Sequence, residues 1–372
     1  MKTTRIAATV LAATTALSLA ACAANEAPAN TAAPGGSSSS APAGSGAALS
    51  GTLAGEGASS TKTAQTTWIS GFQTANPGVT VNYNPNGSGA GRDAFAAGKA
   101  DFAGSDRPLK DEEMGAGKFA GCAADSSALN IPIYISPIAA VYNVEGVKDL
   151  TLDPVTLAKI FTGQVTKWND PAIAATNSGV TLPDADITTV HRQDASGTTN
   201  NFTDTLSQLA PEVWTYGAAD DWPKDLKGEA GSQTAGVIDA VTNGKNIIGY
   251  ADESAAGSLG VASLMIGGKV LKPTAEAAAM IAEKSPKVEG RSASDIALKL
   301  DRKVEGAYPA VLVSYAIACE TYSDPAKASL VKAYLGYITS AEGQQAAAGA
   351  AKSAPLPSEL SAEVATAIGS IK

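Results

Sequence analysis

Three turns rich in glycine, serine and threonine constrain this chain more than any other feature, because each lies between an expected strand and an expected helix. The turns are Gly57-Ala58-Ser59-Ser60, Gly87-Ser88-Gly89-Ala90-Gly91 and Ser196-Gly197-Thr198-Thr199. Strand, turn, helix and strand in repeated order are typical of a mainly parallel sheet with helices on its faces. The sequence therefore predicts an α/β fold.

Short β-branched or apolar runs and the helical spacing of apolar residues define the expected elements. The expected strands cover residues 49–53, 79–83, 99–103, 131–142, 187–191, 246–250 and 310–316, and the expected helices cover 63–74, 92–97, 199–209, 325–339 and 340–351. A further helix is expected to begin at Pro154 and to end at Gly163. The apolar run 131–144 contains Pro132 and Pro137, so we interpret it as a buried strand and not as a membrane helix.

The residue types of the three turns suit an anion. A helix N-terminus presents unpaired N–H groups and the positive end of the helix dipole, while glycine lets the backbone approach a ligand and hydroxyls add donors. Three such ends directed at one point would bind a tetrahedral oxyanion without a metal. Any single turn is better explained as a plain helix N-cap, so the hypothesis depends on the combination of all three with Arg192 and Asp106.

Charge and composition exclude several other functions. The formal net charge is −9, and the absence of basic clusters argues against nucleic-acid binding. An anion must therefore be attracted by local dipoles and one or two placed cations. The single histidine, His191, excludes most histidine-based metal sites, and no zinc-hydrolase or P-loop pattern is present. We expect no metal, no cofactor and no catalysis, because Ser196 and Asp194 have no accompanying base or metal signature beyond His191.

The N-terminus predicts export and lipid anchoring. A short basic start is followed by an apolar run too short to span a bilayer, and Leu19-Ala20-Ala21-Cys22 resembles the bacterial lipobox. We expect a signal peptide at 1–21, a lipidated Cys22 on the outer face of the cytoplasmic membrane, and a flexible linker at 22–47 rich in Ala, Pro, Gly and Ser. The alternative is an ordinary cleaved signal with a chance cysteine.

Two cysteines remain if Cys22 is lipidated. In an exported protein, a pair such as Cys122 and Cys319 favours one disulfide, which would close a loop of nearly two hundred residues. The alternative is two buried free thiols.

Four segments in the same order resemble the PstS-type phosphate-binding proteins of bacterial ABC importers. Residues 191–199, His-Arg-Gln-Asp-Ala-Ser-Gly-Thr-Thr, are similar to the family's Arg-x-Asp-x-Ser-Gly-Thr segment. Residues 101–109, Asp-Phe-Ala-Gly-Ser-Asp-Arg-Pro-Leu, are similar to its Asp-Phe-Gly-Ala-Ser-Asp-x-Pro-Leu segment. Residues 55–59 and 87–91 match its first and second glycine turns, and the resemblance runs from about Leu49 to the C-terminus.

The resemblance implies a periplasmic-binding-protein fold of type II, with two lobes that each contain a mainly parallel sheet. Lobe 1 would comprise residues 48–137 and 307–372, lobe 2 would comprise 138–306, and the ligand would lie in the cleft between them. Cys122 and Cys319 would then lie in the two chain segments of lobe 1. The implied function is high-affinity capture of inorganic phosphate by a monomer and its delivery to the membrane permease subunits of an ABC importer.

The resemblance also implies a role for each site residue. The phosphate ligands would be Ser59, Ser60, Ser88, Asp106, Arg192, Ser196, Gly197 and Thr198. Arg192 would supply the cation, and Asp194 would orient it. Two departures stand out: Ser60 replaces a phenylalanine that is frequent in the family, and Arg107 replaces a residue that is usually small. Arg107 is either a surface charge or a change in the field beside Asp106.

Asp106 is the expected basis of selectivity. Phosphate keeps a proton near neutral pH and sulfate does not, so a carboxylate that only accepts hydrogen bonds pairs with the first and repels the second. Taken alone, Asp106 would be interpreted as a cap of the turn before Pro108. Two other functions stay open: a binding protein for another tetrahedral oxyanion such as sulfate or molybdate, and a surface phosphatase or phosphate sensor.

Overall fold

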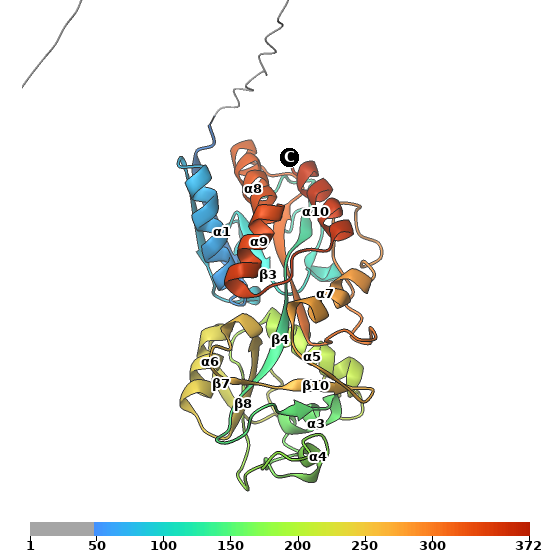
Figure 1. The fold of residues 1–372 in the computed structure, drawn as a ribbon. Coiled ribbons are helices and arrows are strands. Elements are labelled where there is room, and N and C mark those ends of the chain that lie inside the picture. Colours follow the sequence, from blue (N-terminus) through green and yellow to red (C-terminus); the bar gives the residue numbers. More distant parts are fainter. Residues whose placement is uncertain (1–47) are drawn as a thin grey trace, which may run out of the picture. The chain divides into compact units, whose positions relative to one another are not determined.

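A nine-stranded mixed sheet organises residues 48–372, the part of the chain that this computed structural model describes (Figure 1). Its strand order is β2-β1-β3-β12-β4-β8-β6-β7, with β9 paired to β4, and a second sheet has the order β11-β10-β5. The expected signal peptide at 1–21, the lipidation site Cys22 and the linker at 22–47 lie outside the described residues. No helix within 48–372 is long and apolar enough to cross a membrane.

The elements have the following bounds. The strands are β1 (Gly51–Gly57), β2 (Val79–Asn84), β3 (Phe102–Ser105), β4 (Ala128–Asn143), β5 (Thr151–Leu152), β6 (Thr188–Arg192), β7 (Glu229–Gly231), β8 (Ile247–Asp252), β9 (Gly260–Val261), β10 (Ser263–Ile266), β11 (Lys269–Leu271) and β12 (Val311–Cys319). The helices are α1 (Lys62–Ala75), α2 (Ser88–Ala96), α3 (Pro154–Phe161), α4 (Pro171–Ala174), α5 (Gly197–Leu209), α6 (Gln233–Asn243), α7 (Ala275–Lys284), α8 (Pro325–Ile338), α9 (Ala341–Ala351) and α10 (Ser358–Ser370), with 3-10 helices at Asp111–Glu113 and Glu253–Ala255.

The α/β fold is confirmed, and the large sheet is mixed. β1 runs parallel to β2 and β3, and β6 runs parallel to β7 and β8. The central strands β4 and β12 are antiparallel to each other, and β12 is also antiparallel to β3. The reason is topological: β4 carries the chain from one group of elements to the other and β12 follows the return, so the two neighbours must point in opposite directions.

The long strand β4 changes partner along its length. Its residues 128–137 pair with β12, and its residues 138–143 pair with β8. Figure 1 shows α1, α8, α9 and α10 around one end of β4, and α3, α4 and α6 around the other. The division into lobes at 48–137 with 307–372 and at 138–306 stays a prediction.

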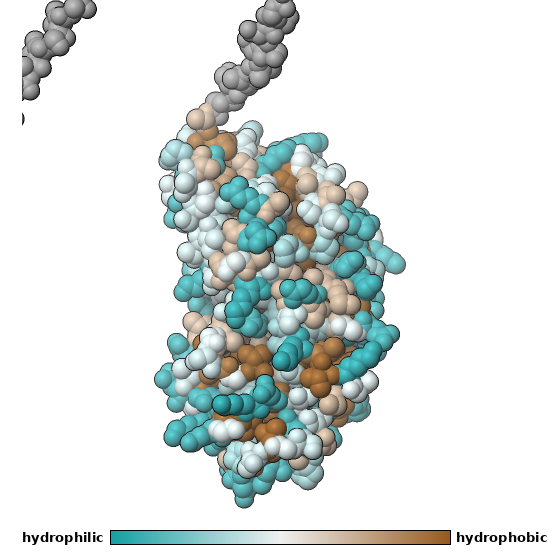
Figure 2. Space-filling view, viewed as in Figure 1, coloured by the Kyte–Doolittle hydropathy of each residue, from teal (hydrophilic) through white to brown (hydrophobic). Residues whose placement is uncertain are grey.

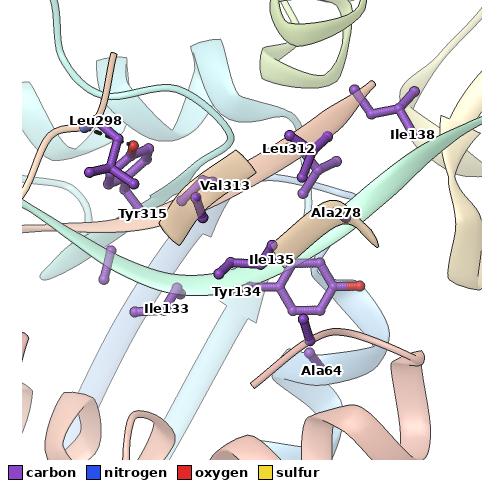
Figure 3. Packing of buried hydrophobic residues seen from close by; sticks show 14 of the residues in the cluster. Ala64, Ile133, Tyr134, Ile135, Ile138, Ala278, Leu298, Leu312, Val313 and Tyr315 are labelled. Atoms are coloured by element: carbon purple, nitrogen blue, oxygen red, sulfur yellow. Dashed lines mark hydrogen bonds between the residues drawn. The ribbon is translucent and has the colours of Figure 1, made fainter. Parts of the chain in front are cut away.

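Burial explains why β4 lacks an alternating pattern. Fifteen of its sixteen residues are buried, as expected for a strand covered on both faces. The ladder with β12 shifts register between Ser314 and Tyr315, where Pro132 lacks the N–H that a regular ladder needs. In Figure 3, Tyr134 lies beside Ala64 of α1 on one side of the sheet, while the Tyr315 hydroxyl accepts the Leu298 N–H at 3.1 Å.

The predicted disulfide is confirmed, because Cys122 and Cys319 are bonded across a sequence separation of 197 residues. Cys319 ends β12, and Cys122 precedes β4. A loop of this length is worth about 4–5 kcal/mol in the chain-entropy model of disulfides.

The surface is predominantly polar. Figure 2 shows apolar residues as separate patches among polar ones, with the larger patches over the part of the molecule that contains α6 and β10. Among residues 48–372, the exposed large hydrophobic side chains are Tyr216 (39%) and Val270 (52%).

Candidate anion-binding site

Four of the expected ligand residues lie against a fifth, Asp106: they are Ser60, Ser88, Gly197 and Thr198. Its Oδ1 accepts hydrogen bonds from the hydroxyls of Ser60 at 2.7 Å and Ser314 at 2.6 Å. Its Oδ2 accepts the Thr198 hydroxyl at 2.9 Å, and its backbone N–H donates to Ser88 Oγ at 3.1 Å. Asp106 therefore touches all three glycine turns at once.

This convergence follows from the sheet. The turns that contain Ser60, Ser88 and Ser196 follow β1, β2 and β6, and Asp106 follows β3. β1, β2 and β3 are parallel, so their carboxyl ends lie at one edge, which is where open α/β sheets place ligands. Every ligand residue predicted from the sequence is buried, and Asp106 is 2% exposed. Buried polar groups require partners, and Asp106 and the surrounding hydroxyls supply them to each other.

The helix behind the third turn begins against Asp106. Ser196 is the N-cap of α5 and accepts the Thr199 N–H at 3.2 Å, so the plain-cap interpretation holds for this hydroxyl. A Cβ at Gly197 would lie 2.7 Å from the Asp106 Cβ and 2.8 Å from Ser88 Oγ. Only glycine lets the first turn of α5 approach this closely.

Gly57 has the same function at the end of β1. It lies opposite Gly104 in β3, has a φ of +137°, and a Cβ here would be 2.0 Å from the Gly104 carbonyl oxygen. Its own carbonyl accepts the Gly87 N–H at 2.8 Å, which ties the first turn to the second. The position therefore holds both turns at their observed spacing.

We expect Gly57→Ala to lower the free energy of unfolding by more than about 3 kcal/mol, because backbone strain and a backbone clash both oppose the methyl group. Gly336→Ala is the matched control, since no atom lies within 4 Å of its Cβ position in α8 and it should be neutral or slightly stabilising. Urea unfolding of the two variants tests this. Equal stabilities would contradict it.

Arg192 ends β6 with its guanidinium 2% exposed, and it forms the expected pair with Asp194. Nε donates to Asp194 Oδ1 at 3.0 Å and Nη2 pairs with Oδ2, so one edge of the guanidinium is fixed by two parallel contacts. Asp194 also accepts the backbone N–H of Gln233 at 2.7 Å, and Gln233 has a left-handed φ of 59°. The Tyr250 hydroxyl accepts the Arg192 N–H at 3.2 Å. The side chain of Arg192 is thus held by Asp194 and its backbone by Tyr250.

Ser59 belongs to the same site but faces α6. Its hydroxyl lies 3.0 Å from Thr234 Oγ1 and accepts the Thr234 N–H at 3.1 Å. Neither Gln233 nor Thr234 was identified from the sequence, because α6 was not among the expected helices. Ser314 was also missed, since a serine inside an apolar strand carries no local signal of a ligand role.

Arg107 is not a surface charge; it is buried, and that alternative is wrong. Its guanidinium donates to Asp220 (Nε to Oδ1, 2.9 Å; Nη2 to Oδ2, 2.7 Å) and to Glu113 Oε2 (Nη1, 2.6 Å). Arg92 Nη2 reaches the same Asp220 at 2.6 Å. Burial opposes ionisation of Glu113, but the hydrogen bond from Arg107 outweighs it and lowers the pKa of Glu113 to about 2. Glu113 is therefore charged at neutral pH.

A second buried carboxylate, Asp252, lies near Asp106. It is fully buried at the end of β8, where it accepts the Ser254 N–H at 3.0 Å and the Tyr134 hydroxyl at 3.3 Å. Burial, together with the charge of Asp106, raises the pKa of Asp252 to about 7 against hydrogen bonds that lower it. This group could not be recognised from the sequence, because its environment is formed by distant segments.

We expect Asp252→Asn to become more stable than wild type as the pH rises. A carboxyl with a raised pKa stabilises the fold below its unfolded pKa and loses that contribution as the pH rises toward the folded value. Urea unfolding at pH 5 and pH 8 should show the difference between variant and wild type growing by roughly 2–3 kcal/mol in favour of the variant. The exposed control Asp184→Asn should show no such growth. A constant difference for Asp252→Asn would refute the assignment.

His191 is a strand residue, as expected. Its ring stacks on Trp222 with centroids 5.1 Å apart and planes 5° apart, and its Nδ1 lies 2.9 Å from the Arg192 carbonyl oxygen. Within residues 48–372, no group of three or more His, Cys, Asp or Glu side chains is placed to hold a metal ion.

Known proteins share both the sequence pattern and the fold. The model of the PBP superfamily domain matches residues 41–342. The phosphate-binding protein PstS 3 of Mycobacterium tuberculosis is 36% identical over 333 residues, which cover 86% of each chain. The phosphate-binding protein PstS of Methanocaldococcus jannaschii is 33% identical over 299 residues, or 75% of each chain.

Solved structures agree on the fold. A high-affinity periplasmic phosphate-binding protein, PfluDING, solved with bound phosphate, superposes with a TM-score of 0.69 at 21% identity, covering 85% of this chain and 93% of that one. A phosphate-binding protein from Stenotrophomonas maltophilia has a TM-score of 0.67 at 18% identity, with the same coverage of both chains.

Proposed function

We propose, because this chain belongs to the PBP superfamily and within it to the PstS family of phosphate-binding proteins, that it captures inorganic phosphate and delivers it to an ABC importer. The observation that carries the proposal is the position of Asp106, which contacts the first and third glycine turns through its buried carboxylate and the second through its backbone N–H. Arg192 joins the same set, since its partner Asp194 lies against Gly87 of the second turn.

The proposed site combines one acceptor with many donors. Ser59, Ser60, Ser88, Ser196, Gly197 and Thr198 offer hydroxyl and backbone donors to the phosphate oxygens, and Arg192 offers its guanidinium. Asp106 accepts the hydrogen bond of the phosphate proton. Asp194 is the positioning residue, because its two contacts with Arg192 hold the guanidinium plane in one orientation. Sulfate has no proton to donate, so its oxygens are repelled by the negative charge of Asp106.

The proposal includes a location and a motion. Lipidation at Cys22 and the linker at 22–47 would keep the protein at the outer face of the cytoplasmic membrane as a monomer. The lobes, 48–137 with 307–372 and 138–306, would close on phosphate and exclude water. The closed form would be recognised by the permease subunits of the importer.

PstS proteins are substrate-binding proteins, and we infer that this chain catalyses no reaction. The test is a phosphomonoester assay with the purified chain. Hydrolysis that Ser196→Ala abolishes would replace the binding function by a phosphatase activity.

Calorimetric titration of the purified chain, stripped of bound ligand, tests the main proposal. Phosphate at neutral pH should give tight saturable binding, and sulfate should give no response. Binding of sulfate alone, or of neither anion, would contradict the proposed function and would leave the similarity as one of fold only.

A further inference from the structure

We infer that Arg92, Arg107 and Asp220 form a clasp that holds the phosphate-binding turns together and sets the lifetime of bound phosphate. The inference rests on the proposed function, and it assigns positioning roles to three residues outside the predicted ligand set. All three clasp side chains are largely buried, with 7%, 7% and 13% of their side-chain surface exposed.

The clasp joins the turns through a single residue, Asp220. Arg92 lies on α2, four residues after Ser88, and Arg107 directly follows Asp106. The Asp220 carboxylate accepts hydrogen bonds from the guanidinium groups of Arg92 and Arg107. Its backbone carbonyl accepts the Ser196 N–H at 2.9 Å. One residue thus connects the cap of α5 to the second turn and to the acceptor carboxylate.

The clasp also spans the predicted cleft. Arg92 and Arg107 belong to the segment 48–137, and Asp220 belongs to the segment 138–306. Arg92 is fixed on its own side by a 2.9 Å hydrogen bond from Nη1 to Ser105 Oγ. The contacts with Asp220 therefore form only when the two segments are together.

Asp220 is held firmly by its own segment. Its neighbour Ala219 donates its N–H to Thr203 Oγ1 of α5 at 3.0 Å. Trp222 stacks on Tyr250 with centroids 5.8 Å apart and packs on Trp214 at 5.4 Å. Because this loop is anchored to α5 and to β8, Asp220 keeps its position. Its two ion pairs therefore restrain the separation of the turns that form the site.

The energetics favour an effect on release. Removing one partner of a buried ion pair costs much more free energy than removing one partner of an exposed pair, because an unpaired charge stays buried. An interaction present only in the closed form slows opening, and differences between related complexes arise mostly in the dissociation rate. Glu113 pairs with Arg107 from the same segment, so it neutralises charge without bridging the cleft.

The experiment compares phosphate kinetics of the purified full-length chain and its variants. Asp220→Asn should raise the dissociation rate of radiolabelled phosphate by about tenfold or more, with an association rate within about twofold of wild type. Glu113→Gln is the matched control and should change dissociation by less than about threefold, because it spares the contacts across the cleft. Unfolding of each ligand-free variant is measured in parallel.

A second variant distinguishes loss of the clasp from misfolding caused by an unpaired buried charge. Arg107→Met with Asp220→Asn leaves Arg92 opposite Glu113, with Nε and Oε1 3.5 Å apart, so charge stays balanced and fast release is still expected. If the wild type binds phosphate and both variants release it at the wild-type rate, the clasp is overturned and the function stands. Lower stability without faster release would also overturn the clasp. A wild type that binds no phosphate would overturn the proposed function, and the clasp with it.

Discussion

Asp106→Asn is expected to remove most of the discrimination between phosphate and sulfate. An amide keeps the shape of the carboxylate, and its oxygen can still accept the hydroxyls of Ser60 and Ser314. Its NH2 group would face the ligand where the carboxylate accepted a proton, so it donates to any unprotonated oxygen. Sites that require such a partner reject the wrong ligand by about 10⁴–10⁵, and this factor should fall by several orders of magnitude.

Competition titrations of phosphate and sulfate measure the ratio of the two affinities. Asp125→Asn, at an exposed carboxylate, is the control and should keep the wild-type ratio. If Asp106→Asn also keeps the wild-type ratio and affinity, Asp106 does not accept the proton of the ligand. Urea unfolding of Asp106→Asn separates loss of folding from this outcome. The folded variant should unfold at about the same urea concentration as the wild type.

Arg192→Met is expected to weaken phosphate binding by about 10²–10³-fold, the effect of losing one partner of a buried charged pair. The change removes the cation and leaves Asp194 as an uncompensated negative group beside Gly87 of the second turn. Calorimetry with phosphate measures the loss.

The double variant Arg192→Met with Asp194→Asn separates the two contributions. It should recover part of the affinity, because the repulsion from Asp194 disappears while the lost guanidinium contacts do not return. Affinity within about threefold of wild type in the single variant would exclude Arg192 as a ligand. Equal losses in the single and double variants would show that repulsion from Asp194 contributes nothing.

The parts of the fold that could be predicted were those with a local signal. The helix expected at 63–74 is α1 at Lys62–Ala75, and the strand expected at 187–191 is β6 at Thr188–Arg192. Helices α6 and α7 were missed, because each buries only a few apolar side chains among small and polar residues, although those few lie at helical spacing. The antiparallel course of β4 and β12 was also missed, since strand direction depends on how distant segments return.

The same distinction applies to the site. The turns before α2 and α5 could be recognised because glycine and hydroxyl residues cluster within a few positions. Ser314 reaches Asp106 through the register of β12 against β3, which opposes Tyr315 to Ser105, and the sequence alone does not contain that register. The burial of Arg107 depends on a carboxylate 113 residues away. Long-range partners of this kind leave no trace in local composition.

The change of partner along β4 has a mechanical consequence. At Pro137 and Ile138 the strand leaves β12 and joins β8, and the Ile138 N–H donates to the Ala310 carbonyl at 2.6 Å where the returning chain begins β12. At this point β4 and the chain that enters β12 lie side by side as a two-stranded ribbon. Two-stranded ribbons tolerate more twist than broad sheets. A rotation of one part of the molecule against the other about this ribbon would keep the β4–β12 ladder intact on one side and the β4–β8 ladder intact on the other.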